Sequence, residues 1–297
     1  MHLSGSICAL ATPFTADGAL DLEACARLID YQLAGGTQAL VVAGSTGEAH
    51  MLTESEWGRL LAFALEHVRG RVPVLAGTGA AATAASVQQT RRAQALGADA
   101  ALVVTPYYVR PTQQGLLRHF TEVAEHGGLP IVMYNVPSRT GCDLLPETAA
   151  RLAGHANIIG LKEARGDAAR IAAVAPLAQP GFAVLSGDDA SAHDAMLAGM
   201  QGVISVVNNL VPAAMRALCD AALRADRAAV EQHAAGLAPL IRALECAPNP
   251  IAVKAGLAAL GICHAGLRLP LIELEPGAAR ARLVHSLAAL TPVASAA

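Results

Sequence analysis

Eight short apolar runs recur along the first 206 residues, and this repetition constrains the fold more than any other feature of the sequence. Their starts lie roughly 20 to 35 residues apart, an interval that suits strand-loop-helix units with parallel pairing. The runs are continuously apolar and do not alternate, so both faces of each strand are expected to be buried. Eight such units in series predict an α/β fold, a closed (β/α)8 TIM barrel. The expected strands are Ile7–Ala11, Ala39–Ala43, Val72–Ala76, Ala101–Val104, Ile131–Tyr134, Ile158–Lys162, Ala183–Ser186 and Val203–Val206.

Stretches with helical patterning separate these runs. Thr53 and Glu56 form the pattern of a capping box at the start of the second stretch. An open, doubly wound sheet would show the same alternation, but no G-x-G-x-x-G follows the first strand, which disfavours the dinucleotide-binding version of that fold. The expected helices include Leu22–Ala34, Glu54–Val68, Ala85–Leu96, Gln114–Glu125 and His193–Ala198.

The chain beyond Val206 is helical in pattern and rich in Ala and Leu to about Leu290. This remainder is too long for the one helix that closes a barrel. We therefore expect residues 1–210 to form the barrel core and residues 211–297 to form a C-terminal helical extension packed on it, within a single structural unit.

Composition limits the class of partner. The net charge of −3 comes without a basic stripe, which argues against nucleic acid. No segment reaches the ~18 uninterrupted apolar residues of a membrane span, and Met1–Phe14 lacks the features of a signal peptide. The six cysteines are scattered and typical of reduced thiols, and the histidines show no metal-ligand spacing. We expect a cytoplasmic protein without a metal or another cofactor.

Chemically distinctive residues gather where the expected strands end. The segment Gly44–Glu48 follows the second strand, Thr105–Tyr108 follows the fourth, and Asn135–Gly141 follows the fifth. Lys162 closes the sixth strand, and Gly187 follows the seventh. Barrel enzymes hold their active sites at the carboxyl ends of the strands, so these segments predict one catalytic face.

Lys162 and Lys254 are the two lysines of the chain. Lys162 ends an apolar run, where burial would disfavour the ammonium and lower the pKa of the amine. A neutral amine can attack a carbonyl and form a Schiff base, which an arginine cannot do. The alternative is a lysine that simply reaches solvent at the end of a strand. Lys254, on an expected helix after Asn249 and Pro250, is expected to be structural.

Hydroxyl and guanidinium groups accompany this lysine. Three of the four tyrosines lie at the same face, and Tyr134 is the best candidate for proton transfer because its strand precedes that of Lys162. Ser45 and Thr46 could offer hydroxyls and backbone N–H groups to an anion. Arg139 could bind a substrate carboxylate through two hydrogen bonds, although its position alone slightly favours a surface arginine. The acidic pair after the seventh strand disfavours a phosphate substrate.

With these residues in place, the chain resembles the dihydrodipicolinate synthase / N-acetylneuraminate lyase superfamily along nearly its whole length. The resemblance implies that Lys162 forms a Schiff base with pyruvate, that Tyr134 transfers protons, and that Thr46 links Tyr134 to Tyr108. The matching strings are Ala11–Phe14, Gly44–Glu48, Thr105–Tyr108, Tyr134–Pro137 and Gly160–Glu163.

The same resemblance implies further roles. Ser45 stands where many members have threonine and keeps the hydroxyl, whereas the backbone of Ile204, together with Gly187, would contact the substrate. The tyrosine that matches Tyr108 reaches into the neighbouring subunit's site in this family. A homodimeric unit, usually within a tetramer, is therefore implied.

Arg139 and Glu163 favour one branch of the superfamily, whose members condense pyruvate with L-aspartate 4-semialdehyde on the route to lysine and diaminopimelate. Another pyruvate-dependent aldolase, acting on N-acetylneuraminate or a 2-keto-3-deoxy acid, stays open, as does a non-catalytic ligand-binding barrel. Members inhibited by lysine carry an asparagine and a glutamate where this chain has Ala81 and Ala85, and Trp57 replaces a frequent histidine. We therefore expect weak or no inhibition by lysine.

Overall fold

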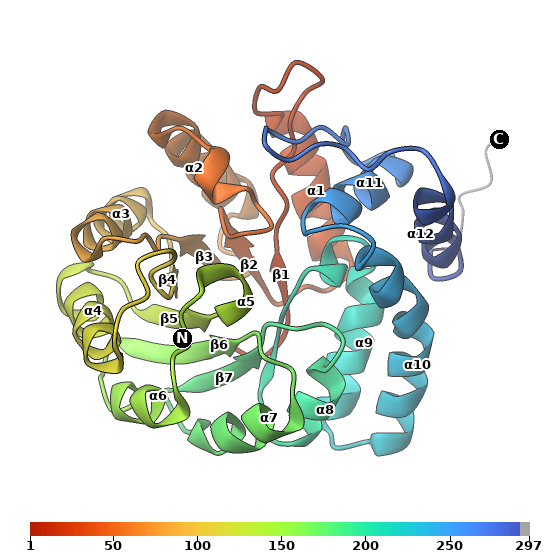
Figure 1. The fold of residues 1–297 in the computed structure, drawn as a ribbon. Helices are drawn as coiled ribbons and strands as arrows, with labels where there is room; N and C mark the ends of the chain where they lie inside the picture. The colour runs from red at the N-terminus through yellow and green to blue at the C-terminus, as the bar shows by residue number, and fades with distance from the viewer. Residues whose placement is uncertain (292–297) are drawn as a thin grey trace.

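Eight parallel strands close into a barrel in chain order in the computed structural model, which describes residues 1–291 (Figure 1). Each strand pairs with the next, and β8 returns to pair with β1. The predicted (β/α)8 barrel is confirmed. The strands are β1 (Gly5–Ala9), β2 (Ala39–Val42), β3 (Val74–Gly77), β4 (Ala100–Val104), β5 (Ile131–Asn135), β6 (Ile158–Glu163), β7 (Ala183–Ser186) and β8 (Gly202–Ser205).

The eight strand predictions fall within two residues of the observed bounds. β1 begins at Gly5 because its ladder to β8 starts where Gly5 meets Gly202. A Cβ on Gly202 would lie 2.4 Å from the Gly5 carbonyl oxygen, so the absence of a side chain allows this close approach. Pro73 lies just before β3, where its carbonyl accepts a hydrogen bond from the Leu40 N–H.

Helices surround the barrel (Figure 1). Both halves of the predicted capping box at Thr53 and Glu56 are present at the start of α2. Three short helices of four to seven residues, α5, α6 and α7, were not expected, because so few residues show no clear helical period. The barrel helices are α1 (Leu22–Ala34), α2 (Glu54–Val68), α3 (Thr83–Leu96), α4 (Gln113–His126), α5 (Pro137–Thr140), α6 (Pro146–Leu152), α7 (Ala168–Val174) and α8 (Ala192–Leu197), with 3-10 turns η1 (Ala49–Met51), η2 (Ala175–Leu177) and η3 (Val207–Asn209).

The strands carry apolar side chains on both faces, which explains their continuous apolar sequence. One face fills the barrel interior, where a cluster includes Ile7, Val41, Leu75, Leu185 and Ile204. The other face packs under the helices in a second, larger cluster. This arrangement leaves the carboxyl ends of the strands, with their loops, to form the mouth of the barrel.

The C-terminal part contains α9 (Pro212–Leu223), α10 (Arg227–Leu244), α11 (Ile251–Ala259) and α12 (Ala278–Ala288). α9 packs against β1 and α8, and α10 packs against α9 and α12 (Figure 1). The division into a core of residues 1–210 and an extension of residues 211–297 stays a prediction. No helix within residues 1–291 has the length and apolar character that crossing a bilayer requires.

Candidate active site

Lys162 and Tyr134 lie side by side at the mouth. They are register partners on β6 and β5, and the Lys162 Nζ lies 4.2 Å from the centroid of the Tyr134 ring. Both side chains are buried, Lys162 at 5% exposure and Tyr134 at 7%. The pairing of parallel neighbouring strands therefore places the amine against a phenol in a site that is shielded from bulk water.

Burial lowers the pKa of Lys162 to about 8. The carboxylate of Asp189 opposes this shift, and the positive charge of Arg139 adds to it. A pKa near 8 leaves about a tenth of the amine neutral at pH 7, whereas an ordinary lysine is almost fully protonated. Lys162 is thus suited to act as a nucleophile towards a carbonyl.

Gly187 gives the lysine its space. A Cβ at this position would lie 2.9 Å from Lys162 Cε and 3.1 Å from Cγ. Real side chains do not sustain such a contact, so the stem of Lys162 occupies the volume that a side chain at residue 187 would need. The predicted contact of Gly187 with substrate stays a prediction.

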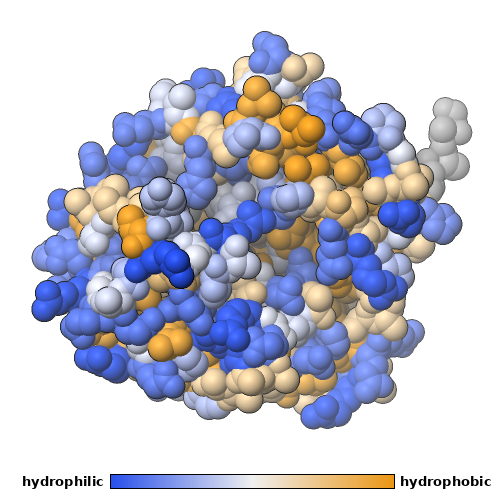
Figure 2. All heavy atoms as spheres, in the orientation of Figure 1, coloured by the Kyte–Doolittle hydropathy of each residue, from blue (hydrophilic) through white to orange (hydrophobic). Residues whose placement is uncertain are grey.

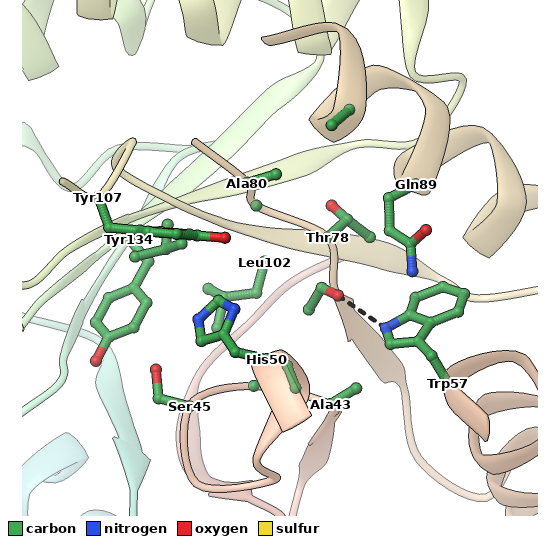
Figure 3. Close-up of a pocket in the computed structure, with 16 residues that line it drawn as sticks. Ala43, Ser45, His50, Trp57, Thr78, Ala80, Gln89, Leu102, Tyr107 and Tyr134 are labelled. Atoms are coloured by element: carbon green, nitrogen blue, oxygen red, sulfur yellow. Dashed lines mark hydrogen bonds between the residues drawn. The ribbon is translucent and has the colours of Figure 1, made fainter. Parts of the chain in front are cut away.

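Ser45 and Thr46 are the two hydroxyl residues of the turn after β2, and their surroundings differ. Ser45 and Tyr134 line the same cavity, and the Ser45 side chain lies near the hydroxyl end of the Tyr134 ring (Figure 3). Burial raises the pKa of Tyr134, and the charge of Arg139 and the Ser45 hydrogen bond work against that rise. Thr46 instead accepts a hydrogen bond of 2.9 Å from Asn249 Nδ2. The expected link from Tyr134 through Thr46 to Tyr108 stays a prediction.

Arg139 is exposed on α5, and its Nη2 donates to the Asn249 carbonyl oxygen over 3.1 Å. Together with Ser45, Tyr107 and Asn249, it lines a cavity of about 290 Å³. A guanidinium fixed at the edge of a cavity can bind a carboxylate. The approach of Asn249 to the site was missed from the sequence, because no local pattern marks a residue that comes from a distant segment, here the one between α10 and α11.

A second cavity of about 210 Å³ adjoins the first. Tyr134 lines it together with Trp57, whose indole N–H donates to the Gly77 carbonyl over 3.2 Å (Figure 3). The Tyr107 ring packs against His50 with 4.8 Å between centroids. The space-filling view shows the molecule hollowed near the centre of the same face (Figure 2). Tyr107 is thus the tyrosine after β4 that lines both cavities in a single chain.

Tyr108 does not join the site of its own chain. It is 91% exposed, adopts a positive φ of 72° and is followed by the exposed Val109. Its backbone N–H donates to Thr140 over 3.1 Å, so the turn that presents it is fixed. A phenol held outwards in this way is compatible with the expected contact to a second subunit, which stays a prediction.

A buried ion pair fixes the turn that carries Ser45 and Thr46. Glu48 ends this turn, and its Oε1 accepts a hydrogen bond of 2.7 Å from Lys254 Nζ of α11. Both side chains are fully buried, and the other oxygen of Glu48 accepts from the Arg268 N–H over 3.1 Å. Lys254 is therefore structural, as predicted. Removing one partner from such a pair would leave an uncompensated buried charge.

Asp189 lies in the loop after β7, and Ile204 lies within β8. Asp189 Oδ2 accepts hydrogen bonds from the backbone N–H groups of Val206 and Val207, at 2.9 and 3.0 Å. Ile204 is fully buried, with its side chain in the barrel interior. The predicted contact of its backbone with substrate stays a prediction.

Groups that could bind a metal lie elsewhere. Within residues 1–291, the one cluster with suitable spacing is Glu122, Glu125 and His126, which is exposed on α4. The mouth of the barrel instead supplies an amine, a phenol and hydroxyls. These groups can form an imine and transfer protons by themselves.

A closed barrel with a buried lysine of lowered pKa at the carboxyl ends of its strands defines an enzyme of the Schiff-base class. Residues 2–289 match the Dihydrodipicolinate synthetase family, and the chain belongs to this family.

Two curated relatives are named 4-hydroxy-tetrahydrodipicolinate synthase. The one from Stenotrophomonas maltophilia K279a is 54% identical over 297 residues, covering 99% of this chain and all of its own. The one from Xanthomonas axonopodis pv. citri is 58% identical over 275 residues, covering 93% of this chain and 91% of its own. The crystal structure of dihydrodipicolinate synthase from Acinetobacter baumannii complexed with pyruvate matches with a TM-score of 0.95 and 40% identity, covering 97% of this chain and 99% of that one.

Proposed function

We propose that this chain condenses pyruvate with L-aspartate 4-semialdehyde to form 4-hydroxy-tetrahydrodipicolinate, a step in lysine and diaminopimelate biosynthesis. The observation that carries the proposal is the buried Lys162 amine beside Tyr134. The names of the two curated relatives and the pyruvate in the similar crystal structure support the choice of substrates.

The reaction begins with attack of the neutral Lys162 amine on the C2 carbonyl of pyruvate. The resulting carbinolamine loses its hydroxyl as water, with a proton from the Tyr134 phenol, and an imine forms. Loss of a methyl proton gives an enamine, whose carbon attacks the aldehyde of the second substrate. The amino group of that substrate then displaces Lys162 from the imine carbon, which closes the ring and restores the amine.

Ser45 would exchange protons with Tyr134 in this proposal, because both line the same cavity and Ser45 opposes the rise in the pKa of the Tyr134 phenol. Thr46, Gly187 and the backbone of Ile204 would bind pyruvate. Arg139 would bind the carboxylate of the semialdehyde at the edge of the 290 Å³ cavity that it lines.

A homodimer, within a tetramer, is the proposed assembly. The exposed Tyr108 and Val109 support it, because a partner subunit would cover them and receive the phenol. Sedimentation of the purified chain tests this proposal, and a Tyr108→Ala variant with unchanged turnover would contradict a role for Tyr108 in a neighbouring site. As a biosynthetic enzyme, the chain is proposed to act in the cytoplasm.

Borohydride reduction in the presence of pyruvate tests the function. We expect a stable pyruvate adduct on Lys162, located by peptide mass spectrometry, and no adduct on Lys162→Ala. Coupled turnover of pyruvate with L-aspartate 4-semialdehyde should exceed turnover of N-acetylneuraminate or 2-keto-3-deoxy acids. An adduct on Lys254, or preferred cleavage of a sugar acid, would contradict the proposal.

A further inference from the structure

Asn249 contacts two residues of the site, although it belongs to the distant segment between α10 and α11. Its side-chain Nδ2 donates to Thr46 Oγ1 over 2.9 Å. Its backbone carbonyl accepts from Arg139 Nη2 over 3.1 Å. The groups after β2 and β5 therefore meet at one residue, the first through its side chain and the second through its backbone.

The side-chain contact determines what the Thr46 hydroxyl can do. A threonine hydroxyl has one hydrogen and two lone pairs, whereas the NH₂ group of an asparagine can only donate. The Asn249 amide therefore occupies a lone pair of Thr46 and leaves the hydroxyl hydrogen free. Thr46 is only 3% exposed, so bulk water is a poor competitor for that hydrogen. A substrate anion in the mouth can accept it.

The segments on both sides of this hydrogen bond are held together independently. Glu48, two residues after Thr46, is bound to Lys254, five residues after Asn249, by the buried contact of 2.7 Å. The turn and the start of α11 therefore keep their relative position without the Asn249 side chain. Loss of the amide should change the orientation of one hydroxyl more than the position of the backbone.

We infer that Asn249 is a positioning residue, whose amide turns the Thr46 hydroxyl hydrogen towards the carboxylate of pyruvate. This inference rests on the proposed function. The side chain and the backbone of Asn249 then serve different substrates. The side chain acts on the pyruvate side through Thr46, and the backbone carbonyl holds Arg139 on the side of the semialdehyde. A change of the side chain alone should leave the second role intact.

The variant Asn249→Ala tests whether the side chain of Asn249 affects pyruvate binding alone. We expect the KM for pyruvate to rise about tenfold, the loss typical of one hydrogen bond to a charged group, with kcat and the KM for the semialdehyde within about twofold of wild type. Asn157→Ala is the matched control, because Asn157 Nδ2 makes one hydrogen bond of 3.1 Å to the Ala124 carbonyl, and the residue precedes β6 at the opposite end of the barrel. Its kinetics should match wild type.

A double-mutant cycle with Thr46→Val distinguishes positioning from general destabilisation. If Asn249 acts through Thr46, Asn249→Ala should add less than about twofold to the pyruvate KM of Thr46→Val. A full tenfold effect in that background, or a normal pyruvate KM in Asn249→Ala, would overturn the inference.

Asn249→Asp tests the direction of the hydrogen bond. A carboxylate can only accept, so it would take the Thr46 hydrogen and repel pyruvate, and the pyruvate KM should rise above that of Asn249→Ala. A wild-type KM in this variant would also overturn the inference. If the wild-type chain itself forms no adduct with pyruvate, the proposed function has failed. A normal wild type with insensitive Asn249 variants rejects the positioning role alone.

Discussion

Gly187→Ala should impair catalysis by displacing Lys162 and not by unfolding the barrel. The added Cβ would lie 2.9 Å from Lys162 Cε, and ordinary contact begins at 3.4 Å. The stem of the lysine must therefore recede by about 0.5 Å. Since a misplacement of about 1 Å can cost 10²-fold in rate, we expect kcat/KM for pyruvate to fall roughly tenfold.

The rate of borohydride trapping with pyruvate isolates this effect, because it reports imine formation before the second substrate binds. Gly236→Ala is the matched control: a Cβ there meets nothing within 4 Å, and the residue lies within α10. It should trap pyruvate at the wild-type rate and gain about 0.5–1 kcal/mol of stability. If Gly187→Ala also traps pyruvate at the wild-type rate, the argument that Lys162 needs the space beside Gly187 is wrong.

Three further predictions follow from the same contacts. Because burial lowers the pKa of Lys162 to about 8, the amine becomes neutral as the pH rises towards 8. The rate of borohydride trapping should therefore increase about tenfold per pH unit below pH 8 and level off above it. A trapping rate that is flat from pH 6 to 8 would contradict this pKa for Lys162. Lys254→Met should lower the free energy of unfolding by about 3–5 kcal/mol, because it leaves the Glu48 carboxylate buried and unpaired. Adding Glu48→Gln should recover part of this loss, and chemical denaturation measures both variants. A double variant less stable than Lys254→Met alone would argue against a buried unpaired charge as the cause. Free lysine at millimolar concentration should inhibit turnover less than twofold. The reason is that the cavity lined by Trp57 and Ala85 has no carboxylate among its described residues to bind an ammonium group. Half-inhibition below 1 mM would show that lysine binds at another site.

The barrel could be predicted because its signal is local. Each buried strand carries a continuous apolar sequence, and residues 183–186 were predicted with the observed bounds. The sequence signal for the nucleophile was also local, because Lys162 ends such an apolar run. Short helices such as α6 escaped prediction because seven residues do not establish a period.

Contacts between distant segments were not predictable in this way. The turn Ser45-Thr46 has two adjacent hydroxyls, but their surroundings depend on the path of the backbone. Ser45 lines a cavity together with Tyr134, and Thr46 accepts a hydrogen bond from Asn249. Asn249 is more than 200 residues from Thr46, and no pattern in the sequence records that approach. The link from Tyr134 through Thr46 to Tyr108 stays a prediction, whereas the contact of Thr46 with Asn249 was not foreseen.

The contacts of the C-terminal segment with the mouth of the barrel affect when the site forms during protein synthesis. Asn249, Lys254 and Arg268 leave the ribosome long after the eighth strand, yet they hold the turn that carries Ser45 and Thr46. In a nascent chain that already contains all eight strands, the turn that carries Ser45 and Thr46 therefore still lacks these contacts. Catalytic competence should arrive only when the segment that contains α11 docks, so activity is delayed until most of the chain has been made.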